Sequence, residues 1–233
     1  MHNKYWRTLS LCALSLGWLN WGLPTFANSS FANSSFGDNS FSATERLHQN
    51  TAPIVAVLPT KQVFSRALQF LQSADRKVQN QNWQGALTDV NQSLLILKPY
   101  SSNDPNYADF MSKIYFQRGL IYEIGFDNHS QAITDFDLAI ALTPRKTSEM
   151  YYSRALVYVA LKSYQNAVND LDQAIRINPQ YANAYKQRGG GHYFLGNISQ
   201  ARTDFATALN LYRQQGNQSE VNRMQRLLQL VNN

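Results

Sequence analysis

Cysteine and histidine are scarce in this sequence. Its 233 residues include one cysteine, Cys12, and four histidines. Cys12 falls in an N-terminal segment that we expect to be removed, which leaves no disulfide, thiolate metal site or cysteine nucleophile. No two histidines are four residues apart on a predicted helix, and none belongs to a recognisable metal or triad motif. We therefore expect no enzyme activity, no metal and no cofactor.

Charged residues are also few, at 15% of the chain, and they form no long block. The formal net charge is +6; without Lys4 and Arg7, 19 basic and 15 acidic residues remain. The basic residues are scattered singly, whereas a nucleic-acid surface needs them gathered on one face. We expect no nucleic-acid partner.

Residues 1–27 have the features of a cleavable secretory signal. Lys4 and Arg7 precede a mostly apolar stretch, and residues 25–27 include small side chains suited to cleavage after position 27. The stretch is shorter than the ~20 apolar residues of a spanning helix and contains Asn20. We expect no stable membrane span after cleavage and an extracytoplasmic location: periplasm, thylakoid lumen or secreted. The alternative is a membrane anchor formed by the uncleaved segment.

Residues 28–60 differ in composition from the rest of the chain. They are rich in Ser and Asn, and residues 28–32 are nearly repeated as residues 33–37. Such polar sequence buries too little apolar surface to offset the entropy lost on ordering. We predict a low-complexity flexible tether, with contacts from its spaced phenylalanines to a partner as the alternative.

From residue 115 onward the chain repeats with a period of 34 to 36 residues. One set of equivalent positions, in chain order, holds Ala132, Phe136 and Ala139, then Ala167, Leu171 and Ala174, then Ala201, Phe205 and Ala208. A weaker copy at Ala86, Val90 and Ser93 precedes them. Each unit contains two segments with apolar residues at helical spacing. A fixed period of this length indicates a solenoid, in which each unit buries its apolar face against its neighbours.

This pattern resembles the tetratricopeptide repeat family over roughly residues 63–213, and most closely the bacterial members, cyanobacterial ones among them. The resemblance implies an all-α fold, a right-handed superhelical α-solenoid of about four helix-turn-helix repeats with a C-terminal capping helix. The predicted solenoid spans residues 61–215, with repeats at about 63–99, 108–144, 148–181 and 182–215 and the capping helix at 216–233.

Two charged positions repeat along the predicted helices. Asp89, Asp135, Asp170 and Asp204 share a site in the second helix, while Arg118, Arg154 and Arg188 share one in the first. Pairing inside each unit would leave Asp89 alone. We therefore predict a ladder between units, in which an exposed pair contributes ~0–1 kcal/mol. Its pairs are Asp89–Arg118, Asp135–Arg154 and Asp170–Arg188, with Asp204 left for Arg223 or Arg226.

Three consecutive glycines, Gly189 to Gly191, fall inside a predicted helix. They cost roughly 3 kcal/mol of helix propensity relative to alanine. No strand precedes them and no Gly-Lys-Ser/Thr follows, so a phosphate loop is excluded. We expect Gly189 at a small packing position, and Gly190 and Gly191 on an open inner surface. His192 is expected to be a packed or partly exposed helix residue.

In this family the first helices line the concave surface, so the resemblance implies a groove that binds a protein or peptide. The candidate groove residues are Phe116, Leu120, Glu123, Tyr152, Leu156, Val159, Lys186, Gly190 and Tyr193. Their mostly apolar character suits an extended or helical apolar segment, although packing against neighbouring helices is the alternative role. Phe116, Leu120, Tyr152 and Gly190 stand where the family's clamp for acidic C-terminal tails needs polar groups, so we expect no binding of such tails.

The expected function is that of a non-enzymatic protein-interaction module, an exported scaffold or assembly factor that holds a protein or peptide in its groove. The alternative is a self-associating structural protein of the cell envelope or thylakoid lumen.

Overall fold

The computed structural model describes residues 61–100 and 105–232, and every regular element within them is an α-helix. The all-α prediction is thereby confirmed for these residues. The predicted secretory signal and tether lie outside them. In chain order the helices are α2 (Lys61–Gln79), α3 (Trp83–Leu97), α4 (Pro105–Phe126), α5 (His129–Leu142), α6 (Ser148–Ala160), α7 (Tyr164–Ile177), α8 (Ala182–Phe194), α9 (Ile198–Gln214) and α10 (Gln218–Leu230).

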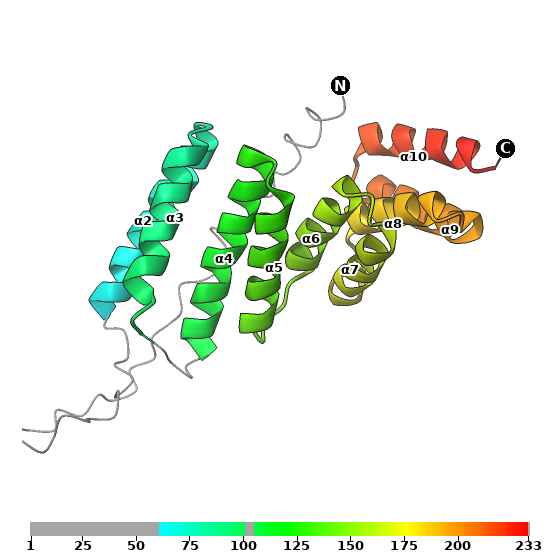
Figure 1. Ribbon diagram of the computed structural model, residues 1–233. Helices are drawn as coiled ribbons and strands as arrows, with labels where there is room; N and C mark the ends of the chain where they lie inside the picture. The colour runs from blue at the N-terminus through cyan, green and yellow to red at the C-terminus, as the bar shows by residue number, and fades with distance from the viewer. Residues whose placement is uncertain (1–60, 101–104, 233) are drawn as a thin grey trace, which may run out of the picture.

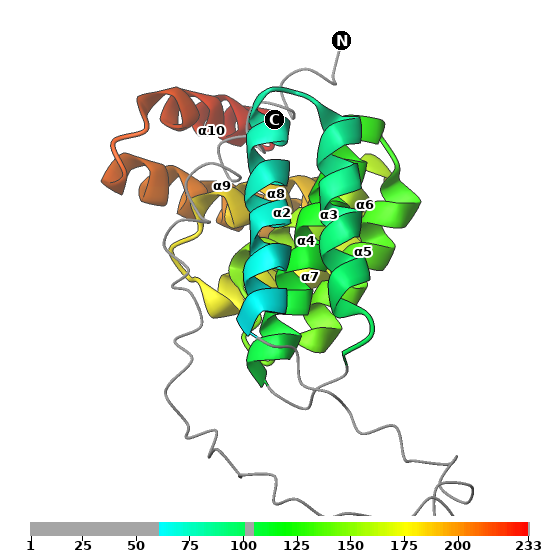
Figure 2. The ribbon, with the colours of Figure 1, turned by 90° about the vertical axis from the view of Figure 1, so that its left-hand side faces the viewer.

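The helices are arranged as a row of stacked pairs (Figure 1). The pairs α2–α3, α4–α5, α6–α7 and α8–α9, called units one to four below, make the most extensive contacts in the molecule. Neighbouring units meet through the second helix of one and the first helix of the next. Figure 2 looks along the row from its α2–α3 end, with α10 crossing at the far end. The described residues thus form a solenoid.

The turn inside each unit uses a left-handed residue followed by a helix-capping residue. Gln81, Lys162 and Gly196 have φ values of 58°, 58° and 80°, and the next residue in each case is the N-cap of the second helix. In unit one the side chain of Asn82 accepts a hydrogen bond from the Gly85 amide at 3.0 Å. A left-handed residue ends a helix, and an Asn cap starts the next by satisfying a free amide.

The two helices of a unit approach closely because a small residue on the first faces a larger one on the second. A Cβ atom added at Gly119 would lie 2.7 Å from the ring of Phe136, and one at Gly189 would lie 2.7 Å from the ring of Phe205. The equivalent pairs in the other units are Ala155 with Leu171 and Ala74 with Val90, all fully buried. Units with glycine at the small position have phenylalanine opposite, and units with alanine have leucine or valine. The combined volume of each pair is therefore nearly constant.

The three consecutive glycines have different surroundings. Gly189 occupies the small packing position, as predicted, and a Cβ at Gly190 would meet no atom within 4 Å. The prediction that Gly191 is also open is wrong, because its added Cβ would lie 2.8 Å from Cγ2 of Val168 in unit three. Gly191 therefore serves packing between units, and only Gly190 leaves space.

Three arginines of the first helices each hold an aspartate on the second helix of the same unit. Nε and Nη2 lie 2.6–2.9 Å from the two carboxylate oxygens in the pairs Arg118–Asp135, Arg154–Asp170 and Arg188–Asp204. The predicted direction of the ladder is wrong. The fork of the guanidinium takes both oxygens of one carboxylate, and the helix packed most extensively against it is that of its own unit. Asp204 is held by Arg188, not by Arg223 or Arg226, and Asp89 pairs with Lys77 at 2.7 Å.

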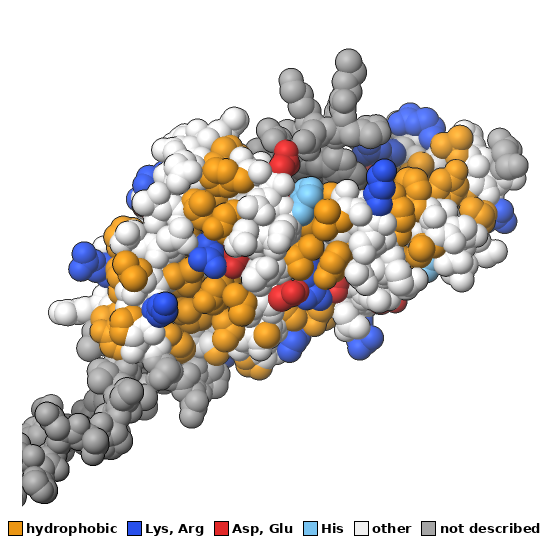
Figure 3. Space-filling view, viewed as in Figure 1, with side chains coloured by type: hydrophobic (Ala, Val, Ile, Leu, Met, Phe, Trp, Pro, Cys, Tyr) orange, Lys and Arg blue, Asp and Glu red, His pale blue; other side chains and the backbone are white. Residues whose placement is uncertain are grey.

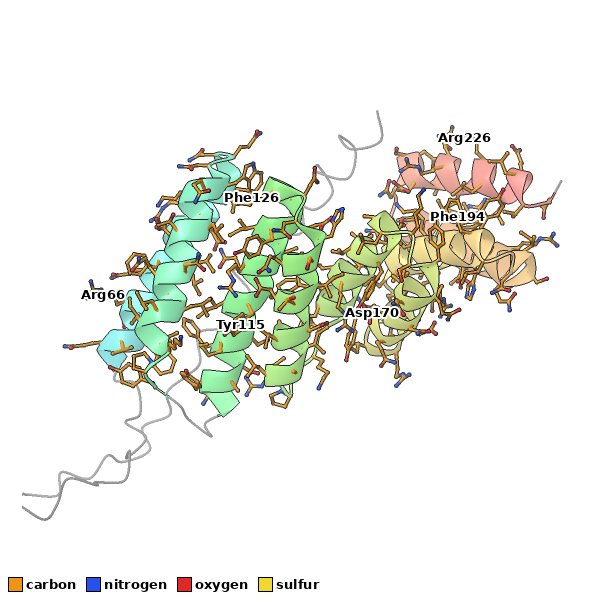
Figure 4. The ribbon with its side chains drawn as sticks, in the orientation of Figure 1. Arg66, Tyr115, Phe126, Asp170, Phe194 and Arg226 are labelled. Atoms are coloured by element: carbon orange, nitrogen blue, oxygen red, sulfur yellow. The ribbon has the colours of Figure 1, made fainter. Side chains whose placement is uncertain are left out.

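The third guanidinium nitrogen supplies the connection between units. Nη1 donates to a side-chain oxygen two residues after the equivalent aspartate of the preceding unit, at 2.6–3.1 Å. These acceptors are Asn91, Asp137 and Asp172. The ring centres of Tyr115, Tyr151 and Tyr185, the leading tyrosines, lie 5.3–5.9 Å from the guanidinium carbons, within the range of a cation–π contact. Figure 4 marks Tyr115 and Asp170 in two of these clusters.

The first testable prediction concerns the small-to-large packing pair of unit four. Replacing Gly189→Ala should lower the free energy of unfolding by about 1–3 kcal/mol, because the new methyl group overlaps the Phe205 ring. Adding Phe205→Leu should recover most of the loss, since it recreates the Ala–Leu pair of unit three. Gly190→Ala is the matched control and should stabilise by up to about 1 kcal/mol, because it gains helix propensity in open space. Urea unfolding of the four proteins measures these differences; strictly additive effects of the two packing changes would contradict this account.

The second prediction separates the two contacts of one ladder arginine. Arg154→Ala should cost about 2–4 kcal/mol of unfolding free energy, because it leaves the buried carboxylate of Asp170 unpaired. Asp137→Asn should change it by less than about 0.5 kcal/mol, because the Asp137 side chain is 53% exposed. Both values come from thermal or urea unfolding, and equal losses for the two variants would refute the assignment of the main contact to Asp170.

Candidate functional site

The first helices of the units lie on the inner side of the stack. α4 contacts α6 and α6 contacts α8, whereas among the described elements no two second helices contact each other as extensively. A stack bends toward the side on which its helices are closer together. The concave side, called the inner surface below, is therefore formed by α2, α4, α6 and α8, the helices that carry all nine candidate groove residues.

The three candidates on α4 are engaged within unit two. Leu120 is only 8% exposed and belongs to the cluster that contains Phe136. Phe116 is half-buried, with its ring centre 5.5 Å from that of Phe136. The Glu123 carboxylate lies 2.8 Å from Nδ1 of His129. These side chains support the packing of the unit and offer a partner little free surface.

On α6, the candidate Tyr152 is held by an aromatic neighbour and a hydrogen bond. Its ring centre lies 4.8 Å from that of Tyr181, and its hydroxyl is hydrogen-bonded to Gln187. Burial raises the pKa of this hydroxyl, against the smaller opposite effect of the hydrogen bond. Leu156 and Val159, further along the helix, are half-buried.

On α8, the candidate Lys186 is covered by the C-terminal helices. It is 8% exposed, its Nζ atom lies 3.0 Å from Oε2 of Glu220 on α10, and it lies 5.6 Å from the ring centre of Tyr212. Burial lowers the pKa of Lys186, while the hydrogen bond and charge of Glu220 raise it. The positive charge is thus neutralised within the protein and does not face a partner.

The remaining α8 candidates are accessible. Gly190 has open space where a side chain would stand. Tyr193, one turn further along, is 46% exposed. We group Gly190 and Tyr193 with the half-buried Leu156 and Val159 of α6, the other candidates on these two inner helices, and call the four positions the open groove below. It carries no charged side chain from the nine candidates, so its chemistry is apolar and aromatic.

A polar cluster beside the open groove was not predicted. The Tyr212 hydroxyl donates to Oδ1 of Asn183 at 2.5 Å, beside the pairs Tyr152–Gln187 and Lys186–Glu220. Its members come from α6, α8, α9 and α10. The repeat pattern does not reveal such a cluster, because Tyr212 and Glu220 lie in the divergent C-terminal part of the chain. The signal available in the sequence was the spacing of Glu220, which follows Lys186 by 34 residues, one period of the repeat.

A second unpredicted contact joins the inner helices of units one and two. Nε2 of the fully buried Gln117 on α4 donates to Oδ1 of Asp75 on α2 at 2.6 Å. Burial raises the pKa of Asp75 from its ordinary value to about 6, and the nearby charge of Arg76 opposes this rise. The sequence did not indicate this pair: a glutamine recurs before the Arg-Gly pair, at Gln117 and Gln187, but Asp75 belongs to no repeated position.

The residues that the structure describes contain no group of three or more His, Cys, Asp or Glu side chains placed to hold a metal ion. His192 is half-buried in α8, and its buried Nδ1 atom has no hydrogen-bond partner. None of the helices α2 to α10 is both long and apolar enough to cross a membrane. On the face shown in Figure 3, basic and acidic side chains are interspersed and do not gather into one basic patch.

Comparison with known proteins links these features to a repeat family. The model of the tetratricopeptide repeat matches residues 148–181. The chain is 30% identical over 84 residues to heat shock protein STI1 of Saccharomyces cerevisiae. The match covers 36% of this chain and 14% of that protein. It is 28% identical over 142 residues to a DnaJ homolog subfamily C member 7 homolog of Dictyostelium discoideum, covering 58% and 24%. The matches span a minor part of both relatives.

Two solved structures share the fold at low sequence identity. A double mutant of MamA superposes with a TM-score of 0.54 and 16% identity, covering 72% of this chain and 94% of that one. YrrB, described as a TPR protein, superposes with a TM-score of 0.50 and 17% identity, covering 68% and 82%. These two structures show a shared fold, and the match to the repeat model identifies residues 148–181, in unit three of the stacked helix pairs, as a tetratricopeptide repeat.

Proposed function

We propose that this protein is an interaction module that binds an apolar segment of another protein, or a peptide, in its open groove. The observation that carries the proposal is the empty position at Gly190 beside the half-exposed ring of Tyr193. An exposed aromatic ring next to free space on a concave helical surface suits the insertion of an apolar side chain. Leu156 and Val159 provide an apolar wall on the neighbouring inner helix.

The chemistry of the surroundings favours apolar over acidic ligands. An acidic tail needs cationic donors, yet the one lysine among the groove candidates is already paired with Glu220. Releasing Lys186 for a ligand would leave the mostly buried carboxylate of Glu220 with only its longer, 3.4 Å contact to Arg223, which is unfavourable for a buried charge. Apolar side chains at Leu120 and Leu156 add no polar group that binds a carboxylate.

The proposed setting is outside the cytoplasm, as an exported scaffold or assembly factor. Support comes from the sequence: two basic residues, a short apolar stretch and small residues around position 27 form a pattern typical of a secretory signal. The scarcity of cysteine is compatible with this setting, because packing alone then stabilises the solenoid.

Self-association is the second candidate, because large apolar side chains are exposed near the C-terminal end. Phe194 is 62% exposed and Leu230 is 67% exposed. Light scattering after size exclusion distinguishes the two proposals: a concentration-independent monomer supports the interaction module, and a stable oligomer supports self-association.

The third prediction tests the open groove by site-specific photo-crosslinking. A photoreactive phenylalanine analogue in place of Tyr193 should yield a defined crosslinked protein, and Gly190→Leu in the same chain should reduce its yield at least tenfold by filling the empty position. The analogue in place of Leu95, which is 61% exposed on α3, is the matched control. The proposal fails if the crosslink at Tyr193 survives Gly190→Leu, or if the control captures the same protein equally well.

The fourth prediction concerns acidic tails. A peptide that ends in two acidic residues and a free carboxylate should show no measurable binding by isothermal calorimetry at about 100 μM peptide, where a micromolar Kd would be detected. Glu220→Gln frees Lys186 and should permit weak binding, which identifies the internal ion pair as the cause. Binding by the unaltered protein in the micromolar range would contradict the predicted ligand class.

A further inference from the structure

Asp75 and Gln117 form a side-chain hydrogen bond between units one and two. They lie on α2 and α4, the inner helices of units one and two, and are joined by the 2.6 Å hydrogen bond from Gln117. The Gln117 side chain is 0% exposed, and its Oε1 atom is buried without a hydrogen-bond partner. A buried acceptor without a donor is destabilising by about 1–3 kcal/mol.

The chemistry of the two groups explains how this acceptor is satisfied. A side-chain amide presents a donor and an acceptor side by side, whereas an ionised carboxylate only accepts. Ionised Asp75 therefore satisfies Nε2 of Gln117 and leaves Oε1 empty. A protonated carboxyl has one acceptor and one donor, so it closes a ring of two hydrogen bonds with the amide.

We propose that Asp75 and Gln117 form a proton-operated latch that ties unit one to unit two and tightens when Asp75 takes up a proton. The latch acts on the relative position of α2 and α4, and hence on the shape of the inner surface near the N-terminal end of the solenoid. It is a regulatory property that does not depend on which ligand the open groove binds.

The electrostatics of the site agree with this geometry. Burial raises the pKa of Asp75 to about 6 in the folded protein, whereas an aspartate in an unfolded chain titrates near pH ~4. The folded state therefore binds the proton more tightly. Its stability increases as the pH falls from above 6 to about 4 and is lost again as the pH rises through 6.

The other charged groups around the latch have partners or neighbours of their own. On α2, Arg76 lowers the pKa of Asp75 by its charge, and Lys77 pairs with Asp89 of α3. α4 carries four charged side chains. Asp109 pairs with Arg145, and Lys113 lies near both of them. Arg118 pairs with Asp135, and Glu123 pairs with His129. None of these pairs includes Asp75. Its carboxyl therefore has Gln117 as its hydrogen-bond partner and Arg76 as the charge that affects its pKa.

The test, and the fifth prediction, measures hydrogen exchange of α2 amides at pH 7.5 and pH 5.0, corrected for intrinsic exchange rates. Protection of α2 in the unaltered protein should increase about tenfold at the lower pH; a full two-unit pKa shift would give at most about a hundredfold, and partial exposure reduces it. Asp75→Asn mimics the protonated state and should give high protection at both pH values. Gln117→Leu removes the amide and should reduce the increase, leaving only the part that burial of the Asp75 carboxyl produces.

The control variant is His129→Gln, because histidine is the side chain that ordinarily titrates between pH 5 and 8. It should keep the pH response of α2 intact. A carboxyl carbon titration of Asp75 by NMR should show a midpoint near 6. A midpoint near 4, an unchanged or falling protection of α2 at pH 5.0, or a pH response that survives in Asp75→Asn would each overturn the proposal.

Discussion

The close approach of two antiparallel helices is the constraint on which the rest of this structure depends. It requires a residue without a large side chain at one position of each first helix, because an aromatic or branched side chain of the second helix fills the adjacent space. Once this distance is set, the arginine on the first helix stands opposite the aspartate on the second with both carboxylate oxygens in reach. The hydrophobic contact thus determines the geometry of the polar one.

The arginines then convert a row of similar units into one connected structure. Each guanidinium divides its donors between a buried aspartate of its own unit and an oxygen of the preceding unit. A surface ion pair contributes little by itself, but a buried carboxylate that loses its partner is costly. This arrangement therefore resists the sliding of one unit against the next, and it keeps the inner helices in a fixed order along the open groove.

The helices and the packing positions were predictable from the sequence, because they follow from spacing along one chain. Small residues such as Gly119 and Gly189 recur with the period of the repeat. The direction of the arginine contacts was not predictable in this way: the sequence favoured pairing between units because Asp89 has no arginine at the repeated site of its own unit, whereas the structure pairs Asp89 with Lys77. Gly191 was misjudged for a related reason, since its neighbour Val168 comes from another unit.

The connection between α9 and α10 has a consequence for how the solenoid ends. Gly216 is left-handed with φ of 68° and Asn217 caps α10, which is the device that closes a hairpin inside each unit. Passages from one unit to the next contain a proline instead, at positions 99, 144 and 179. The chain after α9 therefore makes the tight turn found within a unit. This turn places Glu220 of α10 against Lys186 of unit four. The left-handed backbone at Gly216 thus sets the position of α10, which covers the face of unit four.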